Sequence, residues 1–120
     1  MRYMIMMFGA DLGSMMETRS KEWIREMVYF MRKLDEDLRA ASELVYADGL
    51  TDGSTAKTVR FKDGAVVVID GPFAKVQDSL IGYWVVNVEN ETRALEIAKR
   101  VVAFTQGPIE VRQCGEEPEV

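Results

Sequence analysis

The stretch "VVVIDGPF", residues 66–73, runs four branched apolar residues directly into a carboxylate, a glycine, a proline and an aromatic ring. Such an apolar run is typical of a buried strand, and Pro72 ends it because proline has no N–H to donate to a strand ladder. Just upstream, Asp63-Gly64 stands between apolar segments, which is a strong β-hairpin signal. We therefore predict a hairpin of strands 55–61 and 65–69. The residues after it form either a plain strand end or the floor of a binding site.

The spacing of apolar residues predicts the elements on both sides of this hairpin. Strands are predicted at 3–8, 43–47, 81–88 and 109–112, with loops at 9–19, 48–54 and 74–80. One helix is predicted to begin near Ser20 and a second to be capped by Asn90, since serine and asparagine are preferred N-caps. Apolar residues recur at helical spacing at Trp23, Met27, Phe30, Met31, Leu34, Leu38 and Ala41, and again at Ala94, Leu95, Ala98, Val101 and Val102. This order predicts an α+β fold in which two helices cover one face of an antiparallel sheet.

The first predicted strand is apolar on both of its faces. Tyr3, Ile5 and Met7 alternate with Met4, Met6 and Phe8. Two helices cover only one face of a sheet, so the second apolar face needs another partner. We expect that partner to be the same face of a second copy, which gives a two-fold homodimer.

Composition narrows the functional classes. The 120 residues suit one domain, placed at 1–115, followed by an acidic tail at 116–120. The net charge is −5 and the basic residues are scattered, which disfavours direct nucleic-acid binding. There is no histidine, and Cys114 is the only cysteine, so imidazole catalysis, a thiolate metal cluster and an intramolecular disulfide are excluded. The first apolar run is too short for a membrane span and lacks a cleavage site, so we expect a cytoplasmic protein. We also expect neither a cofactor nor a metal.

Three motifs carry a resemblance to a known family. They are "VIDGPF" at 68–73, "IGYWVV" at 81–86 and "GPIEVR" at 107–112. In this order and spacing they resemble the DGPF-domain proteins of the YCII-related family. The resemblance implies a ferredoxin-like fold assembled as a dimeric α+β barrel, in bacterial cytoplasmic proteins of which some are encoded beside sigma factors. Wider relatives carry a His–Asp pair proposed as catalytic, and a chain without histidine has no such pair.

Asp70 is the first candidate for a functional residue. An aspartate at a strand end commonly accepts a hydrogen bond from the N–H two residues on, but here that residue is Pro72. The carboxylate must therefore bind the N–H of Phe73, a distant donor, water or a ligand. Three roles follow from this: a general base, a ligand anchor, or a group that only shapes the turn.

The remaining candidates are expected to surround Asp70. Gly71 permits an unusual backbone conformation, Pro72 ends the strand, and Phe73 lies under the sheet or lines the cavity. Guanidinium groups that could hold an anionic ligand, or serve as structural partners of Asp70 or Glu110, are those of Arg60 and Arg112. Hydroxyl groups that could donate into a pocket, or sit at the edge of the core, are those of Tyr83 and Tyr46. The methionines at 4, 6, 7, 15 and 16 line an apolar cavity or simply fill the core.

Two functions follow from these candidates. The first is a homodimeric, cofactor-free barrel that binds a small, partly apolar, anionic molecule near Asp70. An enzymatic version uses Asp70 as base, with Arg60 and Tyr83 stabilising negative charge in a proton-transfer, lyase or isomerase step. The second, which only the family resemblance implies, is a non-catalytic regulatory or interaction protein linked to sigma-factor-dependent transcription. Whether the protein is an enzyme stays open at this point, because one fold supports many functions.

Overall fold

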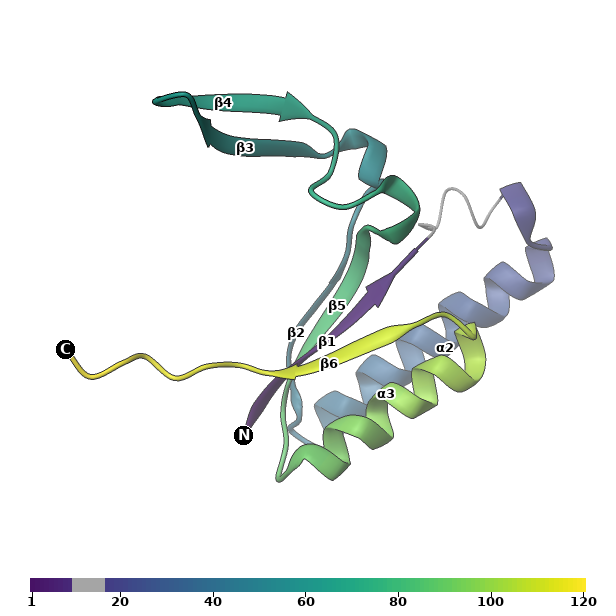
Figure 1. Ribbon diagram of the computed structural model, residues 1–120. Coiled ribbons are helices and arrows are strands. Elements are labelled where there is room, and N and C mark those ends of the chain that lie inside the picture. The colour runs from purple at the N-terminus through teal and green to yellow at the C-terminus, as the bar shows by residue number, and fades with distance from the viewer. Residues whose placement is uncertain (10–16) are drawn as a thin grey trace.

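A four-stranded antiparallel sheet with two helices on one face forms the body of this protein, shown here as a computed structural model that describes residues 1–9 and 17–120 (Figure 1). The strands lie in the order β2-β5-β1-β6. Their bounds are Arg2–Phe8 for β1, Leu44–Gly49 for β2, Leu80–Asn87 for β5 and Ile109–Gln113 for β6. This arrangement confirms the predicted α+β fold with its ferredoxin-like order of elements.

Both helices begin where the sequence predicts. The helix α2 spans Lys21–Ala40, and the side chain of Ser20 caps it by accepting a hydrogen bond from the N–H of Trp23. The helix α3 spans Glu91–Thr105, and Asn90 caps it by accepting from the N–H of Arg93. No helix in the described part of the chain combines the length and the apolar character needed to cross a membrane.

The loop predicted at 9–19 needs a correction at its end. Glu17 and Thr18 are helical, and residues 10–16 lie outside the described part of the chain. Glutamate is a good helix former, and no glycine or proline separates these two residues from α2. The bend at Arg19 and the cap at Ser20 then start the new helix.

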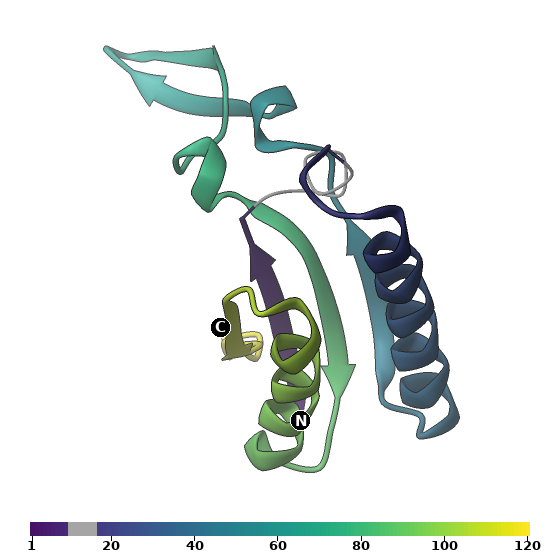
Figure 2. The ribbon, with the colours of Figure 1, turned by 90° about the vertical axis from the view of Figure 1, so that its right-hand side faces the viewer.

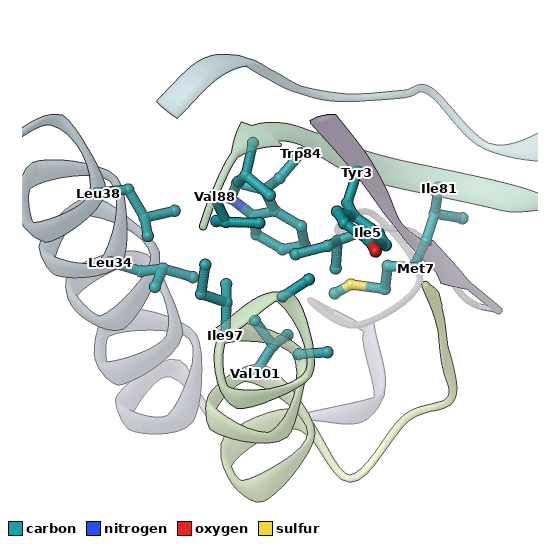
Figure 3. Packing of buried hydrophobic residues seen from close by; sticks show 13 residues of the cluster. Tyr3, Ile5, Met7, Leu34, Leu38, Ile81, Trp84, Val88, Ile97 and Val101 are labelled. Carbon is teal, nitrogen blue, oxygen red and sulfur yellow. The ribbon is translucent and has the colours of Figure 1, made fainter. Parts of the chain in front are cut away.

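The core lies between the helices and the inner face of the sheet (Figure 3). Tyr3, Ile5 and Met7 of β1 point into it, as the alternation predicts. On α3 the buried stripe is Ala94, Ile97, Ala98 and Val101. Leu95 and Val102, expected in the core, are exposed instead, because a stripe at i, i+3, i+4 and i+7 leaves their positions on the outer side of the helix.

The predicted hairpin forms a separate two-stranded sheet, which we call the arm. It consists of β3 (Lys57–Lys62) and β4 (Ala65–Asp70), joined by Asp63 and Gly64, which both have positive φ as a tight hairpin turn requires. Short 3₁₀ turns at Gly53–Thr55 (η1) and Val76–Asp78 (η2) connect it to β2 and β5. The arm lies beyond one end of the main sheet (Figure 2) and leaves the body on the side opposite to the helices (Figure 1). The hairpin is confirmed, but β4 is an exposed strand rather than the buried one that its branched residues suggest.

Candidate functional site

Asp70 lies at the end of β4 and forms an ion pair with a residue of the neighbouring strand. Its Oδ1 is 2.9 Å from Nζ of Lys57, which stands directly opposite in the strand register. The Asp70 side chain is 89% exposed. Among the partners considered from the sequence, the carboxylate therefore binds a distant donor, and it does so at the open surface of the arm.

The residues after Asp70 tie the chain back to the start of β3. Gly71 has φ of +109°, its N–H donates to the carbonyl of Ala56 at 2.8 Å, and its carbonyl accepts from Oγ1 of Thr58 at 2.8 Å. The guanidinium of Arg60 lies 5.1 Å from the ring centroid of Phe73. This cation–π contact places Arg60 against an aromatic ring on the arm.

A pocket of about 680 Å³ opens where the arm meets the body. Pro72 and Phe73 line it, together with Phe8 and Leu80 of the main sheet. Asp70 and Arg60 do not belong to the residues that line this pocket. Among the predicted site residues of the arm, Pro72 and Phe73 therefore line a cavity, whereas the charged residues Asp70 and Arg60 do not.

Tyr46 and Tyr83 lie on the main sheet and not on the arm. Their ring centroids are 6.2 Å apart, and the hydroxyl of Tyr46 donates to Oδ2 of Asp48 at 3.0 Å. This hydrogen bond raises the pKa of Tyr46 above its ordinary value. Arg112 pairs with Glu110 on β6, one of the two structural partners considered for it. Of the methionines, Met4 and Met6 are half-buried on β1, and those at 15 and 16 lie outside the described residues.

A second pocket, which we call the helix–sheet pocket, lies between α2 and the main sheet. Its volume is about 380 Å³, within the range of small-molecule sites. It is mostly apolar and is lined from α2 by Met27, Met31 and Asp35, from β1 by Met7, from β2 and the following residue by Ala47, Asp48, Gly49 and Leu50, and from β5 by Ile81, Gly82, Tyr83 and Trp84. Tyr83 is the predicted site residue that lines it.

The carboxylate of Asp35 lines this pocket and accepts a hydrogen bond from a described residue with only one of its two oxygens. The indole Nε1–H of Trp84 donates to Oδ1 of Asp35 at 3.1 Å. Within the described part of the chain Oδ2 of Asp35 has no hydrogen-bond partner, whereas both oxygens of Asp48 are bonded, to the hydroxyl of Tyr46 and the N–H of Gly49. No lysine or arginine is among the described residues that line the pocket. The site therefore attracts a hydrogen-bond donor or a cation and repels an anion.

Sequence reasoning missed Asp35, although a signal exists. It stands in the segment 32–37, in which every residue except Leu34 is charged, and such a segment looks solvated. Yet Met27, Met31 and Asp35 follow one another at intervals of four, so they share the side of α2 that faces the pocket. No group of three or more metal-ligating acidic or cysteine side chains occurs among residues 1–9 and 17–120.

Comparison with known families and proteins gives one result. The family model of the YCII-related domain matches residues 1–116, nearly the whole chain. A comparison with curated proteins gave no significant match. The motifs at 68–73, 81–86 and 107–112 lie within the matched range.

Proposed function

This chain belongs to the YCII-related domain family, and from that premise we propose that it binds a small, partly apolar molecule in the helix–sheet pocket. The observation that carries the proposal is the Asp35 carboxylate, with Oδ1 held by Trp84 and Oδ2 left open in a largely apolar cavity. A pocket of this kind, apolar with a few fixed polar groups, is the general form of a small-molecule site.

The chemistry of the pocket also selects the ligand class. An oxygen that only accepts hydrogen bonds pairs with an O–H or N–H group, and a carboxylate also pairs with a cation. We therefore propose a neutral or cationic ligand, such as a phenol or an amine, in place of the anionic ligand expected around Asp70. The distinction rests on the open oxygen of Asp35 and on the absence of lysine and arginine among the described lining residues.

An enzymatic version of this proposal uses Asp35 as the general base in a proton-transfer step. Oδ2 accepts the proton, while the bond from Trp84 to Oδ1 holds the carboxylate in place. The earlier constellation of Asp70, Arg60 and Tyr83 stays a prediction. Asp70 and Arg60 belong to the arm and Tyr83 to the main sheet, so these three residues share no pocket described above.

A thermal-shift screen tests the binding proposal. Wild type, Asp35→Asn and Asp70→Asn are screened against phenols, aryl amines and carboxylic acids of matched size. We expect phenols or amines to raise the melting temperature of wild type and Asp70→Asn, since a ligand at 100 times its Kd stabilises by about 2.7 kcal/mol. Asp35→Asn retains an oxygen for Trp84 but loses the charge, so its shift is smaller. Equal shifts in Asp35→Asn, or a preference for acids, contradict the proposal.

We also propose the homodimer expected from the sequence. The side chains of Met4, Met6, Phe8, Tyr83 and Val85 are half-buried on the sheet face opposite to the helices, which supports a same-face contact between two copies. A monomer in light scattering at micromolar concentration contradicts it. The cytoplasmic location stays a prediction.

The alternative function, a non-catalytic interaction protein, is supported by one observation, the exposed apolar side chains of the arm. Its link to sigma factors comes only from the family resemblance.

A further inference from the structure

The arm exposes one continuous apolar face. Val59 stands opposite Val68 and Phe61 opposite Val66 in the strand register, so all four side chains project from the same side of the hairpin. Their exposed fractions lie between 63% and 76%. Proteins that act as monomers rarely leave a contiguous patch of this kind in water.

The arm has little to stabilise it within its own chain. An isolated two-stranded hairpin is marginal in water, and packing against another surface is what makes it stable. At the base of the arm Phe73 covers Arg60, Gly71 binds Ala56 and Thr58, and Val59 borders the pocket between the arm and the body. The more polar face is thus partly covered, while the apolar side chains stay largely exposed, the reverse of what a stable monomer needs.

We propose that the apolar face of the arm packs on a second copy of this chain and acts as the clasp of a two-fold dimer. The inference rests on the proposed homodimer and adds the surface that holds it. The arm projects from the body on the side of the uncovered sheet face (Figure 1). A copy that covers this sheet face therefore lies beside the arm, and two-fold symmetry gives each copy an arm on the other.

The overall shape and charge of the chain favour a second copy as the occupant. The radius of gyration is 16.5 Å, whereas a compact chain of this length has one of about 14 Å, and the molecule is only 18 Å thick along its shortest axis. Of the charged side chains of β3 and β4, Lys57 and Asp70 lie on the apolar face and pair with each other, whereas Arg60 and Lys62 lie on the other face. The apolar face therefore carries no unpaired strand charge that a second copy would have to bury.

Single substitutions on the two faces of β3–β4 test the clasp. Phe61→Ser and Val68→Ser change the apolar face, and Val67→Ser makes the same change as Val68→Ser on the opposite face of the same strand. The dimer dissociation constant of the full chain is measured by sedimentation equilibrium, with circular dichroism as the check on folding. We expect Phe61→Ser and Val68→Ser to raise it at least about tenfold, as truncation of an interface anchor does, and Val67→Ser to raise it far less.

The possible outcomes distinguish a failure of the proposed clasp from a failure of the proposed homodimer. A wild-type dimer that both apolar-face variants leave intact overturns the clasp alone, and the face then serves a different protein. A monomeric wild type overturns the clasp and the dimer together. If the variants lose structure, hydrogen exchange of wild-type residues 57–70 decides: the clasp requires that amide protection in the arm falls on dilution below the dimer dissociation constant. Protection that is independent of concentration contradicts it.

Discussion

The indole N–H of Trp84 on β5 donates a hydrogen bond to Asp35 on α2 across a distance of 3.1 Å. Trp84 is buried, and its bond reaches from the sheet to the helix at the border of the helix–sheet pocket. One contact therefore connects the fold and the candidate site: it fixes the position of the carboxylate and it links α2 to the sheet.

Replacing Trp84 by phenylalanine tests this link. Trp84→Phe keeps an aromatic ring but leaves Asp35 without its donor, and a half-buried polar group without a partner costs about 1–3 kcal/mol. We expect a loss of that size in the free energy of unfolding measured with urea. Trp23→Phe is the control, because Trp23 is only partly buried and its indole donates no hydrogen bond among the described residues. Equal losses in both variants contradict the role given to the hydrogen bond.

A second prediction concerns the guanidinium of Arg93, which binds two carboxylates of different exposure. Nε and Nη2 donate to Glu43, whose side chain is 13% exposed, and Nη1 donates to Glu96 at the surface. Because Arg93 itself is partly exposed, solvent screens both pairs. We expect Glu43→Gln to lower the free energy of unfolding by about 1–2 kcal/mol and Glu96→Gln by less than about 0.5 kcal/mol. Urea unfolding measures both, and similar values for the two variants contradict the prediction.

The elements of the fold are largely predictable from the sequence because they depend on local signals. Ser20 and Asn90 mark the helix starts, and Asp63-Gly64 marks the hairpin turn. Whether β4 is buried cannot be predicted from local sequence signals. Val66 and Val68 look like core residues, but both are largely exposed among the described residues, because burial of a strand depends on which surface packs against it.

The candidate site, too, could be predicted only as far as local sequence signals reach. The motif "DGPF" marks the family, yet its aspartate pairs with Lys57 at the surface, since the hairpin register sets these two residues opposite each other. Asp35 lies in a mostly charged segment, and its place at a pocket depends on the packing of α2 on β5, from which Trp84, 49 positions later, supplies a hydrogen-bond donor. Pairings of this kind depend on tertiary packing, and a single sequence does not encode them as a motif.

The stability at low pH is expected to depend on Asp37. Hydrogen bonds from Lys33 and then from Arg100 of α3 hold the pKa of Asp37 below its ordinary value of 3.8. A lowered pKa in the folded state means that the contribution is present above the ordinary pKa and is lost as pH falls through the lowered one. Wild type should therefore melt above Asp37→Asn at neutral pH, and the difference should shrink as the pH falls below the ordinary pKa of 3.8 and through the lowered pKa. Glu36→Gln, which removes an adjacent exposed charge, should not show this profile; a constant difference for Asp37→Asn contradicts the prediction.

Gly71 is expected to be required for its backbone conformation. Its φ of +109° is one that residues with a Cβ rarely adopt, although no other described residue beyond its two chain neighbours comes within 4 Å of the place that a Cβ would occupy. We expect Gly71→Ala to cost about 1–3 kcal/mol through backbone strain alone. Gly115→Ala is the control, since that position has equal space and no positive φ. Equal melting temperatures for the two variants show that the turn relaxes and that Gly71 is not needed there.

The last prediction concerns Asp70, the aspartate of the motif "DGPF" and the first candidate for a functional residue. Its ion pair with Lys57 joins two exposed side chains, and pairs of that kind contribute between about 0 and 1 kcal/mol. We therefore expect Asp70→Asn and Lys57→Gln to change the free energy of unfolding by less than about 1 kcal/mol, and about 1 M salt to remove most of the effect. A loss above about 2 kcal/mol in Asp70→Asn assigns the carboxylate a structural role that this ion pair does not provide. Ligand binding gives the second readout: a compound that stabilises wild type and Asp70→Asn equally does not use Asp70, whereas one that stabilises only wild type restores the site predicted at the end of the hairpin.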